Sequence, residues 1–368
     1  MSEFLAPLNY DRAQEALCRL SAYGGYDEQK AEEAMGVLRE CYPLVFSKTE
    51  QELFPKGSVL LHLQGASVTD PLIFTGHLDV PDGQATPFMP NVPDIPLSVP
   101  MSRAHVVALL EALEELLRDG YRPGGDLFLA LSMDGLSGAE GARAMADYLQ
   151  GKTGLPVRLA NDANAAALGE ALAGCAKGAE SAVIVTLGTG VGGGVVLNGK
   201  LLTGYTGAAS EPGHTVICDT PNAPLCTCGR RGCFEAYASA TALIRMTRQT
   251  MDAHPESALH TVAANGTVTG RTAFDAAELG DAAAKQVVDD YIHYLAVGIA
   301  NLTNMFSPQV IGLSGGVANQ GENLLRPLRA AVQPMIFGDE YAKKHTTLTT
   351  CTLGYRSGVI GAALLNRV

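Results

Sequence analysis

Hydrophobic and polar positions in the first 150 residues follow two periods, one helical and one extended. Apolar residues that recur every three to four positions predict amphipathic helices, and short apolar runs between Gly and Pro predict buried strands. Because the strands alternate with helices, they predict a parallel or mixed sheet of the α/β class. The predicted helices lie within residues 11–41 (one or two helices), 103–118 and 139–149, and the predicted strands are 58–63, 72–79 and 126–131.

The same alternation continues through the second part of the chain. An alanine-rich stretch has high helix propensity, and two apolar runs flank a glycine-rich turn. No change of composition near residue 150 indicates a flexible linker, so we predict two adjoining segments, residues 1–150 and 151–368. In the second segment the predicted helices are 163–173, 282–304 and 357–365, and the predicted strands are 156–160, 310–313 and the pair within 181–197.

The composition is that of a globular protein with two lobes, since 368 residues, of which 47% are hydrophobic and 17% charged, exceed one ordinary core. A formal charge of −12 argues against a nucleic-acid partner, because phosphate-backbone binding relies on a basic face. The sequence has no run of eighteen apolar residues and no leader-like N-terminus, so we expect no membrane partner and a cytoplasmic location. Eight cysteines in a chain of this length fit a reducing compartment.

One histidine and three closely spaced cysteines occur in the stretch that runs from E-P-G-H to C-T-C-G-R-R-G-C-F-E. They form a complete Cys₃His set for a tetrahedral zinc ion, and four protein ligands leave no position for an activated water, so the predicted role is structural. The alternatives are a disulfide pair or unpaired thiols, although a Cys-x-Cys spacing suits bridging poorly. Gly229 and Gly232 permit the tight turn, and Glu211 and Glu235 are left to face something polar. The predicted zinc ligands are His214, Cys226, Cys228 and Cys233.

Two further stretches have the residue types of a ligand site. In L-A-N-D-A-N, Asn161 and Asp162 stand between a predicted strand and a predicted helix, where side chains can point into a cleft, although Asp162 could merely cap the helix. In T-L-G-T-G-V-G-G-G, the glycines let backbone N–H groups approach a phosphate, and a threonine adds a hydroxyl. The alternative is an ordinary glycine-rich hairpin. The candidate residues of this turn are Gly188, Thr189, Gly190 and Gly192.

Taken in order, N-D-A-N, T-L-G-T-G-V-G-G-G, E-P-G-H, C-T-C-G-R-R-G-C-F-E-A-Y-A-S and V-I-G-L-S-G-G-V resemble the ROK family of bacterial sugar kinases, especially its glucokinase-like members. The resemblance runs from about Tyr148 to the C-terminus. It implies a two-lobed α/β fold, with an actin-like, ribonuclease-H-like kinase lobe and a zinc-binding insertion. It also implies ATP-dependent phosphorylation of a hexose such as glucose, with ATP, Mg²⁺ and structural zinc, and a homodimer.

The resemblance assigns roles to individual residues and shows two departures. Ser210 stands where the family usually has Gly, and the D-x-G-G-T turn with which ROK kinases hold phosphates and metal does not occur, M-D-G-L-S-G at 133–138 being nearest in shape. We therefore expect turnover well below that of an intact kinase. The matched roles are the catalytic base (Asp162), the sugar ligands (Asn161, Glu211, His214 and Glu235), the second phosphate loop (Gly188, Thr189 and Gly190) and the nucleotide loop (Gly315 and Gly316).

The first segment resembles the catalytic domain of M20-type zinc peptidases over about residues 1–150, in G-S-V-L-L-H-L-Q-G, P-L-I-F-T-G-H-L-D-V, V-V-A-L-L-E-A-L-E-E-L-L-R-D-G and D-L-F-L-A-L-S-M-D-G. His77 and Asp79 match a zinc ligand and its supporting carboxylate. Met101, however, stands near the place of the bridging aspartate, and Gly135 and Leu136 replace the paired glutamates. One histidine and one aspartate cannot hold two zinc ions, so we interpret both as strand-end residues.

The leading hypothesis is an ATP-dependent sugar kinase. The first alternative is a non-catalytic sugar-binding protein of kinase ancestry, which would keep the zinc lobe and the sugar ligands without phosphoryl transfer. The second alternative is an M20-type zinc metallohydrolase. A sugar-responsive repressor would need a basic helix-turn-helix N-terminus, and the acidic first segment argues against one.

Overall fold

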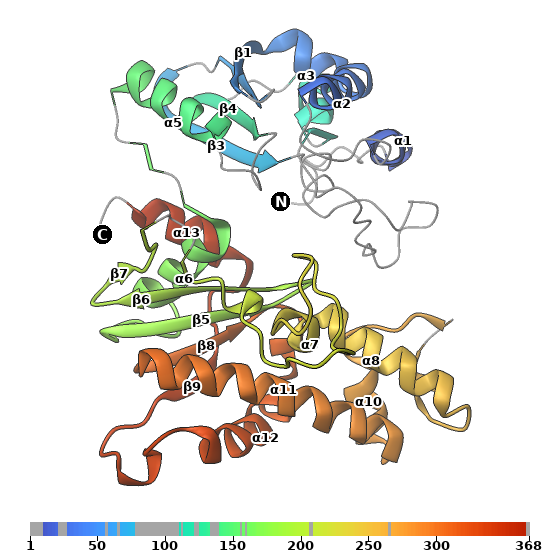
Figure 1. Ribbon diagram of the computed structural model, residues 1–368. Helices are drawn as coiled ribbons and strands as arrows, with labels where there is room; N and C mark the ends of the chain where they lie inside the picture. Colours follow the sequence, from blue (N-terminus) through green and yellow to red (C-terminus); the bar gives the residue numbers. More distant parts are fainter. Residues whose placement is uncertain are drawn as a thin grey trace. The chain divides into compact units, whose positions relative to one another are not determined.

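The computed structural model divides into two compact units, Met1–Leu159 and Ala160–Val368 (Figure 1). Each unit contains a sheet with helices packed on it, which confirms the α/β class predicted from the sequence. Among the described residues, no helix is both long and apolar enough to span a bilayer. The structure describes residues 10–20, 28–55, 58–64, 67–77, 110–111, 113–120, 125–132, 140–154, 157–158, 160–205, 209–263 and 266–365.

The sheet of the first unit consists, in its described part, of β1 (Glu50–Phe54), β2 (Ser58–Leu63), β3 (Ser67–His77) and β4 (Gly125–Ser132). Its order is β1-β2-β4-β3, in which β2 pairs antiparallel with both neighbours and β3 pairs parallel with β4. In the described part of this unit the helices with defined bounds are α1 (Tyr10–Leu20), α2 (Glu28–Cys41), α3 (Pro43–Lys48) and α5 (Glu140–Thr153), and residues 110–111 and 113–118 are also helical.

The alternation of side chains along β2 explains how helices cover both faces of this sheet. Leu60 packs with Met145 and Leu149 of α5. Leu61, its neighbour in sequence, belongs instead to the buried cluster formed with α1, α2 and α3. One strand therefore contributes to two apolar layers, as a buried central strand does.

The sheet of the second unit has the order β7-β6-β5-β8-β9. It comprises β5 (Ser181–Leu187), β6 (Val191–Leu197), β7 (Lys200–Leu201), β8 (Val310–Ser314) and β9 (Thr347–Thr350). The strands β5, β6 and β7 form an antiparallel meander, whereas β8 and β9 run parallel to β5. Because β5 and β8 are parallel neighbours, the turns that follow them emerge at the same edge of the sheet.

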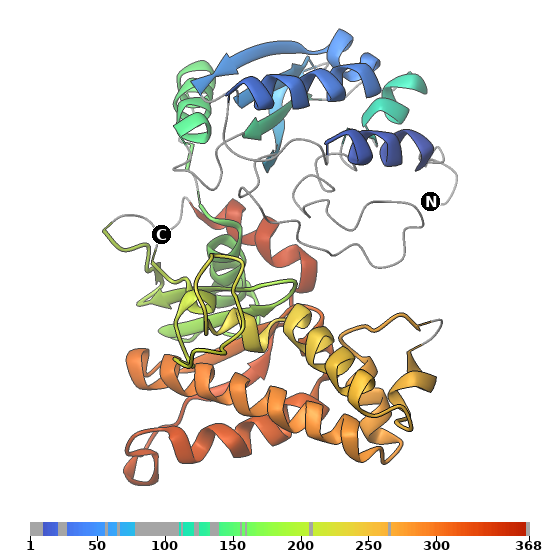
Figure 2. The ribbon, with the colours of Figure 1, turned by 45° about the vertical axis from the view of Figure 1, so that its right-hand side comes forward.

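Helices cover both faces of this second sheet (Figures 1 and 2). On one face lie α6 (Asp162–Ala173) and α13 (Ser357–Leu364), and on the other lie α8 (Ala240–Ala253), α10 (Thr272–Glu278), α11 (Ala282–Phe306) and α12 (Glu322–Val332). Val185 of β5, Leu313 of β8 and Leu295 of α11 are fully buried in the main core. The shorter elements are α7 (Glu235–Ala238), α9 (Leu259–Val262) and the 3₁₀ turns η2 (Pro212–His214), η4 (Val317–Gln320), η5 (Gln333–Met335), η6 (Asp339–Tyr341) and η7 (Gly354–Arg356).

Most predicted elements are confirmed, including the strand at 58–63, the two helices within 11–41 and the hairpin within 181–197. The strand predicted at 156–160 is wrong for its described residues, because 157, 158 and 160 have no regular structure. A five-residue run becomes a strand only beside a partner strand, and no sheet pairs with these residues in the described part of the chain. His77 is the last residue of β3, while Asp79, Met101, Gly135 and Leu136 lie outside the described residues.

Helices α6 and α13 approach each other closely because glycines line their contact. A Cβ atom on Gly361 would overlap the carbonyl oxygen of Ala165, and one on Gly169 would overlap that of Ser357. Helix α13 also carries Gly358, at which an added Cβ would meet nothing within 4 Å. The two helices therefore need a bare backbone at 169 and 361, but not at 358.

Gly361→Ala is expected to lower the free energy of unfolding by about 1–3 kcal/mol, because the added methyl group must displace the backbone of α6. Gly358→Ala, the same change in the same helix, is expected to raise it by up to about 1 kcal/mol through helix propensity. Urea denaturation of both variants measures the two effects. Equal unfolding midpoints for both would contradict the close approach of the helices.

Candidate functional site

The beginning of α6 positions the first candidate residues. Asn161 caps the helix, since its Oδ1 accepts the N–H groups of Ala163 at 2.9 Å and Asn164 at 3.2 Å. The alternative that Asp162 serves merely as the cap is therefore wrong. Asp162 is the first residue of α6, and its exposed carboxylate accepts only the N–H of Ala163, at 2.8 Å. A carboxylate here is stabilised by the helix dipole and keeps the capacity to accept a proton.

The glycine-rich turn between β5 and β6 lies between the beginning of α6 and the side chain of Glu235. A Cβ atom on Gly192 would stand 3.3 Å from the Cβ of Ala163. One on Gly190 would overlap Oε2 of Glu235. At Gly188, by contrast, an added Cβ would meet nothing within 4 Å. Glycine thus allows the turn to touch its neighbours on two sides, while position 188 has open space around it.

The first residues of α8 hold this turn in place. The N–H of Ala240 donates to the carbonyl of Gly188 at 2.8 Å, and the hydroxyl of Thr241 donates to the carbonyl of Thr189 at 2.8 Å. Within the turn, the N–H of Gly188 donates to the carbonyl of Gly190 at 3.0 Å. These hydrogen bonds fix the backbone of the candidate phosphate loop before any ligand arrives.

The E-P-G-H stretch forms η2 beside β6, where a Cβ on Gly213 would overlap the carbonyl of Val191. Glu211 precedes this turn. Although the residue is exposed overall, desolvation of its carboxyl group raises the pKa of Glu211. The charge of His214 opposes this rise, and the negative charges of Asp162 and Glu235 add to it. His214, Asp162 and Glu235 therefore lie close enough to Glu211 to act on its carboxyl group.

The predicted zinc ligands come together as a compact group. The donor atoms of His214, Cys226, Cys228 and Cys233 all lie within 4.8 Å of one another. Two of the closest approaches are 3.6 Å, between Nδ1 of His214 and Sγ of Cys226, and 3.7 Å, between the sulfurs of Cys228 and Cys233. This donor chemistry and spacing fit a tetrahedral soft divalent ion with no open position.

Two glycines and an arginine shape this loop. Gly229 and Gly232 adopt φ of +83° and +79°, and a Cβ on Gly232 would also overlap the carbonyl of Cys218. Burial opposes ionisation of Cys228, but hydrogen bonds from the backbone and side chain of Arg230 lower the pKa of Cys228 to about 6. A thiolate is therefore favoured at the most exposed of the three cysteines, and a thiolate is the form that binds metal.

Glu235, the buried first residue of α7, connects the cysteine loop to the glycine-rich turn. Its Oε2 accepts the N–H of Val191 at 3.1 Å. Its Oε1 accepts the hydroxyl of Thr227 and the thiol of Cys226, the latter at 3.4 Å. The sequence analysis did not identify Thr227 as a partner of Glu235. The signal that could have indicated it is its position between Cys226 and Cys228, two of the predicted zinc ligands.

The candidate nucleotide loop follows β8. Gly315 adopts φ of +89°, and a Cβ there would overlap the carbonyl of Leu187 at the end of β5, whereas at Gly316 it would meet nothing within 4 Å. Thr186 and Ser314 are paired across β5 and β8, with their hydroxyl oxygens 2.9 Å apart. The two glycine turns therefore lie side by side at one edge of the sheet.

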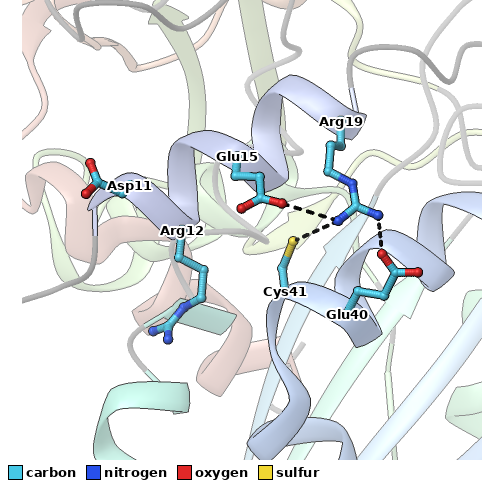
Figure 3. A pocket seen from close by; sticks show the side chains of 6 residues that line it. All are labelled: Asp11, Arg12, Glu15, Arg19, Glu40 and Cys41. Carbon is cyan, nitrogen blue, oxygen red and sulfur yellow. Dashed lines mark hydrogen bonds and ion pairs between the residues drawn. The ribbon is translucent and has the colours of Figure 1, made fainter.

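A separate open pocket of about 390 Å³ lies in the first unit, between α1 and α2 (Figure 3). Arg19 reaches Glu40 of α2 and Glu15 of its own helix, the latter at 3.5 Å, and donates toward the sulfur of Cys41 at 3.8 Å. Burial raises the pKa of the Cys41 thiol. Arg19 is thus paired with carboxylates of the first unit itself.

Comparison with known proteins finds one family and several relatives. A model of the ROK family matches residues 139–368. A curated glucokinase from Halalkalibacterium halodurans is 41% identical over 225 residues, which are 60% of this chain and 66% of that protein, so the chain spans slightly less than two thirds of its relative. A curated xylose repressor from Bacillus subtilis is 30% identical over 58% of this chain and 51% of its own length.

Among solved structures, the crystal structure of a ROK family glucokinase from Streptomyces griseus in complex with glucose and AMPPNP is similar to this chain with a TM-score of 0.52. Its sequence is 36% identical, and the match covers 60% of this chain and 71% of that one. The family match at residues 139–368 includes every residue of the candidate site.

Proposed function

The chain belongs to the ROK family and has its mixed α/β kinase fold, and from this premise we propose that it is an ATP-dependent sugar kinase acting on a hexose such as glucose. The observation that supports this proposal best is the grouping of Asp162, Glu211 and Glu235 beside the 188–190 turn. A set of carboxylates next to a glycine turn provides acceptors for hydroxyl groups and donors for phosphate in one place.

Glu211, His214, Glu235 and Asn161 would bind the sugar. The two carboxylates accept hydrogen bonds from hydroxyl groups, and Asn161 adds its side-chain NH₂ group, because its oxygen is already used by the cap of α6. Glu235 is held from two sides by Val191 and Thr227, so its carboxylate is oriented before the sugar binds. Such preorganisation lowers the entropic cost of binding.

Asp162 would act as the general base. Its carboxylate is exposed and lies at the beginning of a helix whose N-cap is the neighbouring Asn161. It would accept the proton of the attacking hydroxyl as the bond to phosphorus forms. The neighbouring Asn161 can orient the same hydroxyl but cannot take its proton.

The two adjacent glycine turns would hold the nucleotide. The backbone N–H groups of Thr189 and Gly190 would donate to the phosphates, because that of Gly188 already donates to the carbonyl of Gly190. The open position at Gly316 would accommodate the nucleotide closely. Mg²⁺, when bound with ATP, neutralises charge that develops on the phosphates. The protein's own contribution is position, since phosphoryl transfer requires little covalent chemistry from side chains.

We also propose that His214, Cys226, Cys228 and Cys233 hold a structural zinc ion. The fit of the four donors supports this assignment, and the hydrogen bond that Thr227 donates to Glu235 would link the metal loop to the sugar site. Zinc would then order the loop between His214 and Glu235, which are two of the four proposed sugar ligands. It would take no part in phosphoryl transfer.

A coupled ADP-release assay with Mg-ATP across a panel of hexoses tests the proposed function. We expect ADP release that depends on the hexose, with glucose among the substrates. The sequence has no D-x-G-G-T turn to hold the phosphates from the other side, so we expect a kcat below the usual range of roughly 1–100 per second.

Calorimetric titration with the same hexoses distinguishes the alternative. Hexose binding without hexose-dependent ADP release would identify a non-catalytic sugar-binding protein, and the kinase assignment would be withdrawn. Absence of both binding and release would remove the sugar site itself.

A further inference from the structure

Two cysteines outside the metal loop face each other in the second unit. Cys175 lies just after α6, and Cys351 lies just after β9, 176 positions along the chain. Their sulfur atoms are 3.9 Å apart, and both residues are partly exposed. Neither belongs to the donor group around His214. The contact therefore joins two segments that are far apart in sequence and have no part in the proposed metal site.

One buried carboxylate holds both of these segments. Glu170 accepts the N–H of Cys175 at 2.9 Å and, from the segment that follows Cys351, the N–H groups of Thr352 at 3.2 Å and Leu353 at 2.8 Å. Glu170 is only 1% exposed. A buried carboxylate that accepts three N–H groups is satisfied and costly to move, so it keeps the two cysteine backbones together.

The strand between the two cysteines leaves room for both sulfurs. A Cβ atom on Gly312 of β8 would stand 2.8 Å from the sulfur of Cys175 and 3.1 Å from that of Cys351. Contacts this short would force both side chains aside. The glycine thus provides the space in which the two sulfurs can approach each other by rotation about their Cα–Cβ bonds.

From this geometry we propose that Cys175 and Cys351 form a reversible dithiol–disulfide pair that cross-links the end of α6 to the segment after β9. The oxidant is a low-molecular-weight disulfide. One protein thiolate attacks it and forms a mixed disulfide, releasing one small thiol. The second protein thiolate then attacks the protein sulfur of that mixed disulfide and releases the other small thiol. Two electrons and two protons pass from the pair of cysteines to the small disulfide.

The geometry allows Cys351 to complete an exchange that begins at Cys175. A hydrogen bond with Cys175 and burial both raise the pKa of the Cys351 thiol. Attack by the thiolate of Cys175 leaves Cys351 as the resolving thiol, already within 3.9 Å of the sulfur that it must reach.

A metal ion is a weaker alternative for the same cluster. The oxygens of Glu170 already accept three backbone N–H groups, so the carboxylate is committed to holding the chain. Two thiols alone do not complete the four-ligand shell of a structural zinc. The cluster therefore suits thiol oxidation better than metal binding.

The cross-link is expected to stabilise the second unit, because it restricts the unfolded chain over a long loop. Purified zinc-loaded protein is treated with oxidised glutathione, alkylated, digested without reduction and mapped by mass spectrometry. We expect a linked pair of peptides containing Cys175 and Cys351, and a melting temperature higher by about 5–15 °C that dithiothreitol reverses. Cys351→Ser should lose both effects, whereas Cys41→Ser should retain them.

The peptide map of the oxidised parent protein needs no variant, so it tests the Cys175–Cys351 link even if Cys351→Ser does not fold. Cys175→Ser serves as a second variant. Full alkylation of both cysteines after oxidation would overturn the proposal. Linkage of either to another cysteine, or a second zinc ion that is lost in Cys351→Ser, would overturn it equally. None of these outcomes depends on sugar phosphorylation.

Discussion

Replacing Asp162 with asparagine is expected to lower kcat for hexose phosphorylation by about 10²- to 10⁴-fold, the usual contribution of a general base. A sugar hydroxyl is a weak acid and needs a carboxylate to accept its proton as it attacks phosphorus. Asparagine keeps the size and one acceptor oxygen of aspartate but cannot take up that proton. Hexose affinity should change by less than about tenfold, since the proposed sugar ligands are other residues.

The structure also predicts that the same variant folds normally. Asn161 caps α6 through its own side chain, so the change at Asp162 leaves the cap intact. Glu322, which is likewise the first residue of a helix in this unit, provides a matched control. Glu322→Gln should keep both stability and turnover. Transfer at the parent rate in a well-folded Asp162→Asn protein would deprive the proposed kinase of its base.

Removing the proposed zinc should have the second large effect. We expect about one zinc ion per chain, and its removal by a chelator should lower the melting temperature by about 10 °C or more, because metal affinity contributes directly to folding. Hexose affinity should fall as well, since His214 is proposed both as a zinc ligand and as a sugar ligand, and Glu235 contacts Cys226 and Thr227. Metal analysis, melting curves and glucose titration measure the three effects.

Single substitutions separate metal loss from general damage to the loop. Cys233→Ser removes a ligand that is fully buried and should lose the zinc. Cys218→Ser changes a cysteine of the same loop that is outside the donor group, and it should keep the zinc and the parent melting temperature. A metal-free protein with unchanged melting and unchanged glucose affinity would contradict the zinc assignment.

Some of the candidate site could be predicted because its signals are local. The cysteine loop and its two glycines lie within a few residues of one another, so ligand chemistry and turn chemistry indicate the group without a fold. The helix α6 and the hairpin β5–β6 follow from helix propensity and from apolar runs around glycines. The strand predicted at 156–160 failed because an isolated five-residue run carries no information about a partner strand.

The sequence by itself therefore determined the α/β class, the donor set of the proposed metal loop and the residue types of the proposed sugar and phosphate sites, since each depends on side-chain chemistry and near neighbours. Only the tertiary structure decided that Asn161, and not Asp162, caps α6, and that Glu235 joins Val191 to Thr227. It alone also brought Cys175 beside Cys351. Contacts of this kind depend on strand order and helix packing, which are set by burial over the whole unit and leave no periodic pattern along the chain.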